Sequence, residues 1–416
     1  MNVLLTGAFG NIGTSTLGEL IRAGHRVRCF DLPTPANRAT ALRYGRELGE
    51  NLQVAWGDLR QPEEVAAAVC GQDVVVHLAF IIPKLSITGF ESELRPDWAR
   101  EINVGGTRNL IQAMKLLPAP PRLMFTSSYH VFGQTQDQPP PRTVWDPVQP
   151  IEHYAHHKVE CERLVRTSGL EWSIYRLSAA LPFAIKLDPG MFDVPLDNRM
   201  EFVHSRDIGL AIANGMSQPD IWRKVLLIGG GARCQYYYRE IVERVLAAAG
   251  MGMLPPEAFS QVQFATDWVD TGESQRLLAY QTRTLDDYIR EMKAALGARR
   301  WLFRAARPLA RRILLSRSPY YQLAHAAHTA EAPAKLAAPA LAHAIELTPE
   351  LKELLVDTAR QLKGRAQRLF MARAVVALGP DGAQKAEREL GWPGRFIALG
   401  LRELGKNVDV RLAKQV

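Results

Sequence analysis

Tyr154 and Lys158 stand four positions apart in a run that predicts a helix over 154–168. Residues at this spacing share one helix face. A free tyrosine is too weak a base near neutral pH, but a nearby ammonium and the positive nicotinamide of an oxidised cofactor favour the phenolate. Tyr154 could then take a hydroxyl proton while hydride leaves the same carbon, with Ser128 holding the substrate oxygen by a hydrogen bond. Alone, this spacing is more typical of an ordinary solvent-facing helix.

A glycine-rich turn supplies the missing cofactor site. Thr6-Gly-Ala-Phe-Gly-Asn-Ile-Gly13 follows an apolar run over 1–6, which predicts a buried strand, and precedes a predicted helix over 14–23. Glycines at such a turn let backbone N–H groups approach a pyrophosphate at a helix N-terminus. The residues assigned to cofactor binding here are Gly7, Gly10, Asn11, Ile12 and Gly13.

An acid follows the next predicted strand. The run 25–30 ends in Asp31, where a carboxylate can accept hydrogen bonds from the adenosine ribose diol and would repel a 2′-phosphate. This favours NAD over NADP. Arg38 is the counter-argument, because it could serve a phosphate, but we expect it in a loop beyond the acid.

Alternating runs predict the architecture. Strand-like runs at 52–56, 74–78, 122–126, 172–175 and 225–228 alternate with helical runs at 62–70, 97–116, 154–168, 206–216 and 237–249. This pattern indicates an α/β fold with a doubly wound parallel sheet of the Rossmann type. The irregular segments around 80–96 and 180–200 are expected to form a small substrate-binding part, with a closing loop and helix over 268–296.

Several ordered motifs resemble the extended short-chain dehydrogenase/reductases, namely the NAD-dependent epimerase/dehydratase group with the 3β-hydroxysteroid dehydrogenase-like enzymes beside it. The motifs are TGAFGNIG, Asp31, Asp58-Leu59, His77-Leu-Ala79, Asn103-Val-Gly-Gly-Thr-Arg-Asn-Leu110, Thr126-Ser-Ser-Tyr-His-Val-Phe-Gly133, Tyr154-Ala-His-His-Lys158 and Phe202-Val-His-Ser-Arg-Asp-Ile208. The resemblance covers about 1–292.

The resemblance implies further site residues. Asp58 and Leu59 should lie by the adenine, and the backbone of Leu78 and Ala79 along the cofactor. Lys158 should also bind the nicotinamide ribose, together with Tyr154. Asn103 matches a position at the active-site helix and joins Ser128, Tyr154 and Lys158 as a catalytic candidate. The implied substrate is a sugar nucleotide, a steroid-like molecule or another secondary alcohol.

Two departures from the family pattern stand out. His156 and His157 occupy positions where small residues are usual, and could alter the site edge or point outward. The segment Tyr175–Phe183 lacks the Gly-Pro signature of many nucleotide-sugar enzymes, which weakens that substrate class. His77 and His204 have no second ligand at metal spacing, so we expect no metal.

Charge is concentrated in one segment. The chain of 416 residues has a net charge of +8, and eight Lys and Arg residues without any Asp or Glu lie between Met292 and Ala330. We expect residues 293–322 to form a basic amphipathic segment, kinked at Pro308. It suits an anionic membrane surface or packing on the enzyme about equally, and nucleic acid less. The four separated cysteines predict reduced thiols in a cytoplasmic protein, and we expect a homodimer.

The remaining chain predicts a separate domain. Residues 323–345 are rich in Ala, Pro and His and indicate a linker. Residues 346–416 are expected to be an all-α, helix-turn-helix-like domain around Gly391-Trp392, similar to the N-terminal helical region of a bacterial transposase family. Pro393 and Gly394 replace polar base-reading groups, so we expect at most weak, sequence-indifferent DNA binding.

The first 292 residues therefore predict an NAD-dependent oxidoreductase or epimerase, which share the same hydride transfer. A protein of another class, a catalytically silent NAD-sensing or DNA-tethered regulator using the C-terminal domain, is the alternative. The Ser-Tyr-Lys set favours the enzyme.

Overall fold

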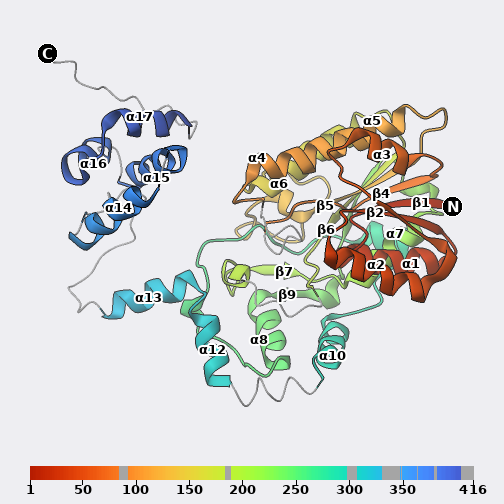
Figure 1. The fold of residues 1–416 in the computed structure, drawn as a ribbon. Coiled ribbons are helices and arrows are strands. Elements are labelled where there is room, and N and C mark those ends of the chain that lie inside the picture. Colours follow the sequence, from red (N-terminus) through yellow and green to blue (C-terminus); the bar gives the residue numbers. More distant parts are fainter. Residues whose placement is uncertain are drawn as a thin grey trace. The chain divides into compact units, whose positions relative to one another are not determined.

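The computed structural model describes residues 1–83, 92–182, 189–297, 307–329, 347, 349–362, 364–378 and 382–403. The chain divides into two compact units, Met1–Ala330 and Glu331–Val416. Figure 1 shows the path of the chain through the elements of each unit.

A seven-stranded parallel sheet forms the centre of the first unit, in the order β3-β2-β1-β4-β5-β6-β8. Its strands are β1 (Asn2–Thr6), β2 (Arg26–Asp31), β3 (Leu52–Trp56), β4 (Val74–His77), β5 (Arg122–Ser128), β6 (Trp172–Leu177) and β8 (Lys224–Ile228). β1 pairs with β2 on one side, Leu5 opposite Cys29, and with β4 on the other, Leu5 opposite Val76. The strand order reverses between β1 and β4, which is where ligands bind in sheets of this type.

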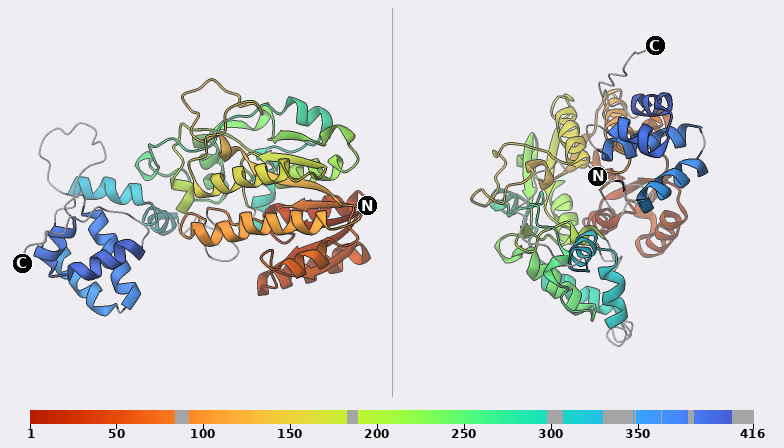
Figure 2. Two further views of the ribbon diagram at one scale, coloured as in Figure 1. Left: turned by 90° about the horizontal axis from the view of Figure 1, so that it is seen from above. Right: turned by 90° about the vertical axis from the view of Figure 1, so that its left-hand side faces the viewer.

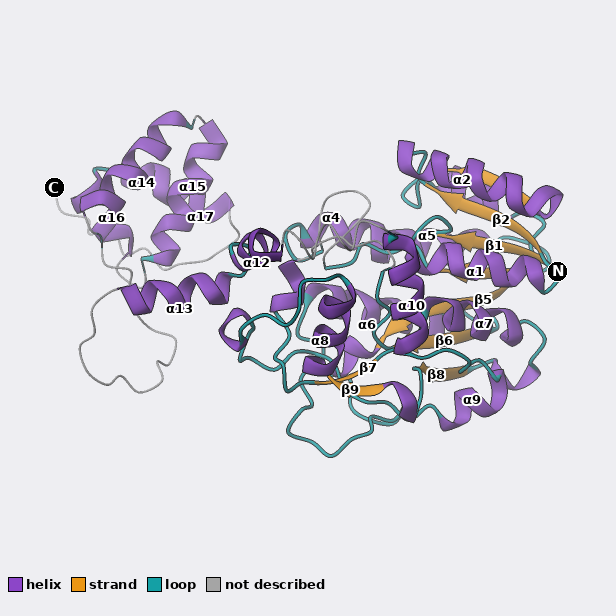
Figure 3. Cartoon of the chain, turned by 90° about the horizontal axis from the view of Figure 1, so that it is seen from below, coloured by secondary structure: helices purple, strands orange, loops and turns teal. Residues whose placement is uncertain are grey.

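Helices cover both faces of the sheet. Side chains alternate along β1, so Val3 and Leu5 join one buried cluster and Leu4 another. On the first face, shown in Figure 3, lie α1 (Asn11–Arg22), α2 (Pro35–Leu48), α7 (Ser205–Gly215) and α9 (Gly272–Leu278). On the second face lie α3 (Pro62–Val69), α4 (Pro96–Arg100), a π-helical turn (Glu101–Gly105), α5 (Gly106–Lys115) and α6 (His153–Arg166).

Helices α1 and α7 pack at unusually short range. A Cβ atom at Gly209 would lie 2.8 Å from the carbonyl oxygen of Ser15, so this approach requires glycine. The hydroxyl of Ser15 donates to that of Ser205 over 3.0 Å. The contact fixes α1, and with it the glycine turn that precedes it.

A third buried cluster forms the smaller part of this unit. It contains the antiparallel pair β7 (Arg199–Glu201) and β9 (Gln235–Tyr237), with α8 (Tyr238–Ala248), α10 (Leu285–Leu296), α12 (Arg307–Leu315) and α13 (Pro319–Thr329). Leu314 of α12 is 1% exposed within this cluster, and Ser318 donates to the carbonyl of Ala258 over 2.6 Å.

The described part of the basic segment thus packs on the rest of the first unit, one of the three alternatives open from the sequence. The guanidinium of Arg311 donates to the carbonyl oxygens of Met251, Gly252 and Met253. Residues 298–306 of the segment lie outside the described residues. The compact unit extends to Ala330, beyond the boundary at 292 that the motifs predict. Binding of the segment to an anionic membrane stays a prediction. None of the described helices is long and apolar enough to cross a bilayer.

In its described residues the second unit is all-α. Its helices are α14 (Pro349–Gln361), α15 (Gly364–Ala377), α16 (Gly382–Leu390) and α17 (Gly394–Glu403), drawn in blue in Figure 2. They enclose their own core, which includes Met371, Leu390, Trp392 and Ile397. The two short helices expected around Gly391-Trp392 are present as α16 and α17. The transposase resemblance and the helix-turn-helix role stay predictions. Of the predicted linker, 323–329 belongs to α13, and the rest lies outside the described residues.

The sequence expectation for Arg38 is wrong. Arg38 lies in helix α2 and not in a loop. Thr34 caps this helix by accepting a hydrogen bond from the Asn37 N–H over 3.1 Å, and Pro35 stands in its first turn. The guanidinium of Arg38 lies 5.2 Å from the centre of the Trp56 ring.

Candidate active site

The glycine turn connects β1 to α1 by close backbone contacts. Gly7 has a φ of +66°, and a Cβ there would lie 2.7 Å from the Ala79 nitrogen. A Cβ at Gly13 would lie 2.1 Å from the Gly7 carbonyl oxygen. The turn therefore leaves a surface of bare backbone at the N-terminus of α1, which suits a phosphate group.

Asp31 stands at the end of β2 with its carboxylate held in place. It accepts hydrogen bonds from the Phe9 N–H at 3.0 Å, the Leu32 N–H at 2.9 Å and the Asn37 amide at 3.0 Å. Burial raises the pKa of Asp31 above its usual value, against the effect of these hydrogen bonds. The donors fix the position of the carboxylate at the cavity edge.

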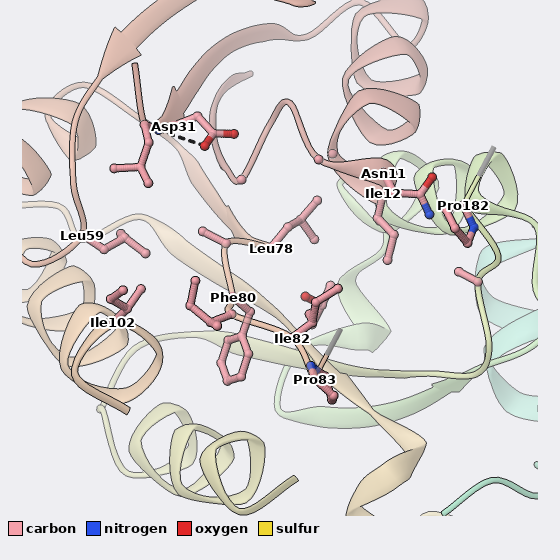
Figure 4. A pocket seen from close by; sticks show the side chains of 18 of the residues that line it. Asn11, Ile12, Asp31, Leu59, Leu78, Phe80, Ile82, Pro83, Ile102 and Pro182 are labelled. Carbon is pink, nitrogen blue, oxygen red and sulfur yellow. Dashed lines mark hydrogen bonds between the residues drawn. The ribbon is translucent and has the colours of Figure 1, made fainter. Parts of the chain in front are cut away.

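A cavity of about 750 Å³ runs along the carboxyl ends of the strands. Every residue assigned from sequence to the dinucleotide and not to catalysis lines it: Gly7, Gly10, Asn11, Ile12, Gly13, Asp31, Asp58, Leu59, Leu78 and Ala79. Figure 4 shows Asp31 and Leu59 toward one end and Ile82, Pro83 and Pro182 toward the other. The Asp58 carboxylate forms an ion pair with Arg60 at 2.6 Å. The shape and donors fit a dinucleotide such as NAD.

Tyr154, Ser128 and Lys158 lie together beside this cavity. β5 ends in Ser128, whose side chain lies close enough to the Tyr154 hydroxyl to lower its pKa. Lys158, on the same face of α6 as Tyr154, donates from Nζ to the Thr126 carbonyl over 2.7 Å. Its Nζ lies 5.7 Å from the centre of the Tyr154 ring. The sequence placed these three residues together, and the structure has them so.

Burial has the largest effect on the pKa values of Tyr154 and Lys158. It raises the pKa of the Tyr154 hydroxyl well above its usual value, although the Ser128 side chain acts in the opposite direction. Burial also lowers the pKa of Lys158 to about 7. In the free chain the lysine alone therefore leaves Tyr154 as the phenol, and the phenolate expected from the sequence also requires the positive nicotinamide that was part of that expectation.

Helix α6 is anchored to the sheet by a buried ion pair. The Arg176 guanidinium on β6 donates to the Glu162 carboxylate over 2.9 and 2.8 Å. Burial alone would raise the pKa of Glu162, but Arg176 outweighs it and holds the pKa below the usual value. This pair fixes the helix that carries Tyr154 and Lys158.

Asn103 has a positioning contact that the sequence did not specify. From the π-helical turn, its side chain accepts from the Ile81 N–H at 2.6 Å and donates to the Ile81 carbonyl at 3.0 Å. Its amide also lies 3.4 Å from Nδ1 of His157. His157 is 4% exposed, so it points inward, whereas His156 is exposed. Burial lowers the pKa of His157 to about 4.

Three further side chains at the cavity escaped sequence reasoning. Nδ1 of His130 lies 2.9 Å from the Glu152 carboxylate, and the His130 ring meets the Tyr154 ring edge-on. The Glu93 carboxylate accepts from the N–H groups of His153 and Tyr154, at 3.1 and 2.9 Å, and so caps α6. His130 belongs to the motif Thr126–Gly133, so the sequence could have indicated it as a site residue. Glu93 had none, because 60 residues separate it from His153.

The two histidines considered for a metal have other partners. His77 is buried between the hydroxyls of Thr6 and Thr107, at 2.7 and 3.0 Å. His204 lies 3.7 Å from the Glu291 carboxylate. Among the residues that the structure describes, no three His, Cys, Asp or Glu side chains gather as a metal site would need.

Comparison with known proteins agrees with this geometry. Residues 3–181 match the family model described as "NAD dependent epimerase/dehydratase family". A 3-beta-hydroxysteroid dehydrogenase of Mycolicibacterium neoaurum is 33% identical over 138 residues, 32% of this chain and 34% of the relative. UDP-glucose 4-epimerase 3 of Oryza sativa is 32% identical over 145 residues, 33% and 37% of the two chains. The matched segment thus spans about a third of these curated relatives.

Solved structures share the fold over a longer stretch. A short-chain dehydrogenase/reductase superfamily protein from Agrobacterium tumefaciens with bound NAD has a TM-score of 0.58 at 19% identity, covering 74% of this chain and 100% of that one. UDP-glucose-4-epimerase from Stenotrophomonas maltophila, with NAD and formylated UDP-arabinopyranose, has a TM-score of 0.60 at 21% identity, covering 71% and 98%. At this identity the likeness shows the fold alone.

Proposed function

We propose that this chain, whose residues 3–181 match the model of the NAD-dependent epimerase/dehydratase family, is an NAD-dependent oxidoreductase or epimerase. It acts by hydride transfer at a secondary alcohol or ketone carbon, with Tyr154 as the acid/base. The observation that carries the proposal is that Ser128 and Lys158 lie beside Tyr154, next to a cavity lined by all the predicted dinucleotide residues other than Tyr154 and Lys158.

The residues divide the work between binding and proton transfer. The glycine turn would hold the pyrophosphate, and Asp31 the adenosine ribose. Bound NAD supplies the hydride acceptor and a positive ring near Tyr154. Tyr154 takes the alcohol proton as a phenolate. Because burial raises the pKa of its hydroxyl, this phenolate forms only with added positive charge nearby. Ser128 holds the substrate oxygen, and Lys158 contributes charge and holds the nicotinamide ribose.

The chemistry of the cavity wall supports an uncharged, apolar substrate. Toward the catalytic end the described wall is apolar at Ile82, Pro83, Pro182, Val194 and Phe264. Its ionisable side chains are the carboxylates of Glu93, Glu152 and Asp193 and the imidazole of His130.

A nucleotide sugar carries a diphosphate, which cationic or N–H donors normally bind. Within the described wall, Arg60 is the one arginine or lysine, and it is paired with Asp58. We therefore propose an apolar secondary alcohol or ketone as the substrate class, ahead of a nucleotide sugar.

The test is hydride transfer by the full chain, followed as NADH absorbance, with a panel of uncharged cyclic alcohols and of nucleotide sugars. Tyr154→Phe keeps the ring but removes the transferable proton, so we expect turnover to fall by about 10²-fold or more while NAD affinity is unchanged. Wild-type turnover by Tyr154→Phe would refute the acid/base assignment. NAD binding without turnover of any panel member would favour the silent regulator.

A further inference from the structure

Lys158 has an aromatic ring against its ammonium. Nζ lies 3.5 Å from the centre of the Phe80 ring, close enough for a strong cation–π contact. The Phe80 ring also meets the Tyr154 ring edge-on, with centres 5.7 Å apart. Phe80 thus covers both members of the pair.

The ring separates the ammonium from the cavity. Phe80 lines the cavity, whereas Lys158 is 3% exposed and is not among the described residues of the wall. Figure 4 shows the Phe80 side chain extending beside Leu78 and Ile82. Nζ donates to the carbonyl of Thr126, a residue that itself lines the cavity, so a cavity ligand that displaces the Phe80 ring can reach Nζ.

The backbone on both sides of Phe80 is fixed. The Ala79 N–H donates to the Thr6 hydroxyl over 3.2 Å. The Ile81 N–H and carbonyl are both bonded to the Asn103 side chain, at 2.6 and 3.0 Å. Movement of Phe80 therefore consists of rotation about its side-chain bonds, with no shift of the strand end.

We propose that Phe80 is a gate over Lys158: its ring covers the ammonium in the free chain and rotates away when ribose hydroxyls of the dinucleotide approach Nζ. The inference rests on the proposed function for the identity of the entering ligand. The first part of the proposal, that the Phe80 ring covers Nζ of Lys158, concerns the free chain alone. Because the closed arrangement must be given up on binding, the apparent affinity for the dinucleotide is reduced by the fraction of time the gate is closed.

Amine labelling tests the cover without any cofactor. With a pKa of about 7, Lys158 is mostly a neutral, nucleophilic amine at about pH 8, so only steric cover would keep it from reacting. The free full chain is treated with an acetylating reagent, and each lysine is followed by peptide mass spectrometry. Exposed Lys115 is the internal reference.

We expect wild-type Lys158 to react more slowly than Lys115, and Phe80→Ala to raise its rate by about tenfold or more, the factor expected if the ring covers Nζ at least about nine-tenths of the time. Ile82→Ala is the matched control, since it removes another apolar side chain from the same wall. Equal Lys158 rates in wild type and Phe80→Ala would overturn the gate. Circular dichroism checks that Phe80→Ala is folded. If it is not, Phe80→Leu is used in its place.

Calorimetric measurement of NAD binding tests the second part of the proposal, that the Phe80 ring rotates away when the dinucleotide binds. Phe80→Ala should bind NAD about threefold to tenfold more tightly than wild type, because no ring must be displaced, and Ile82→Ala should not. NAD should then slow acetylation of Lys158 in Phe80→Ala. Weaker binding by Phe80→Ala than by Ile82→Ala would overturn the gate. If wild type and both variants bind no NAD, the proposed function fails, and the labelling result still decides the cover.

Discussion

At the scale of single residues, the site contains side chains whose pKa values are shifted from their usual values. Lys158 is buried against Phe80 and its pKa falls to about 7, while the pKa of Tyr154 rises. In the free chain these shifts favour the neutral forms of both residues, the uncharged amine and the phenol. A positive ring beside Tyr154 would reverse this preference for the tyrosine.

Lys158 should make stability depend on pH. Its folded-state pKa, about 7, lies below the unfolded value near 10.5, so between these values the unfolded chain binds more protons and stability rises with pH. Lys158→Met removes the titrating group. We expect the unfolding free energy of wild type relative to Lys158→Met to increase, by up to a few kcal/mol, from about pH 7 to pH 10. Parallel denaturant titrations measure it, and a flat difference would contradict the shift.

Asp31 should determine the choice between NAD and NADP. Its carboxylate can accept from a ribose diol and would repel a 2′-phosphate, so wild type should bind NAD more tightly. Asp31→Asn keeps the shape and removes the charge, and should reduce the preference by at least about fivefold, or about 1 kcal/mol. Calorimetry with both dinucleotides measures the ratio. Burial raises the pKa of Asp31. As the pH is lowered, the preference for NAD over NADP should therefore be lost at a higher pH than it would be with an exposed aspartate. Tighter NADP binding by wild type would instead point to Arg38.

At the scale of elements, most of the sheet and its helices could be predicted from sequence because buried parallel strands are continuous apolar runs. The strand predicted at 74–78 is β4 at Val74–His77, and the helix at 154–168 is α6 at His153–Arg166. Helix α2 was missed although Thr34-Pro35 is a helix-start signal, since its face is only weakly apolar. The contacts of Phe80 and Glu93 could not be predicted, because they join segments far apart in sequence.

Two glycines around α1 should behave oppositely. A Cβ at Gly13 would lie 2.1 Å from the Gly7 carbonyl oxygen, while one at Gly18 would meet nothing within 4 Å. Gly13→Ala should therefore distort the turn and abolish measurable NAD binding. Gly18→Ala, within the same helix, should leave NAD affinity unchanged and stabilise the chain by about 0.5–1 kcal/mol. NAD calorimetry and thermal unfolding of both variants test this. Unchanged affinity in Gly13→Ala would show that the turn does not hold the dinucleotide.

At the scale of the whole molecule, the candidate site lies within the first compact unit. Every described residue of the cavity wall precedes position 265, and the unit ends at Ala330. The C-terminal helices have a core of their own. We therefore predict that their role, including any DNA binding, is independent of the chemistry proposed for the N-terminal part.

Truncation should separate these parts at a defined place. A chain ending at Ala330 should keep the NAD affinity and thermal stability of the first unit. A chain ending at Glu291 loses Met292, Leu296 and Leu314 from the third cluster, and each buried side chain of this size contributes about 2 kcal/mol. We expect the shorter chain to unfold at a clearly lower temperature in a thermal melt. Equal melting of the two chains would mean that α12 and α13 add nothing to the fold.

The close packing of α7 on α1 has a consequence for synthesis. Ser15 and Ser205 touch across 190 positions of sequence, so α1 leaves the ribosome long before the helix that covers it. Until then, the apolar side chains of Leu17 and Leu20, which share a cluster with Ile208 and Ile212, lack part of their cover. Such long-range contacts slow folding and leave partly folded chains open to aggregation. The nascent enzyme should therefore acquire cofactor only after α7 has emerged.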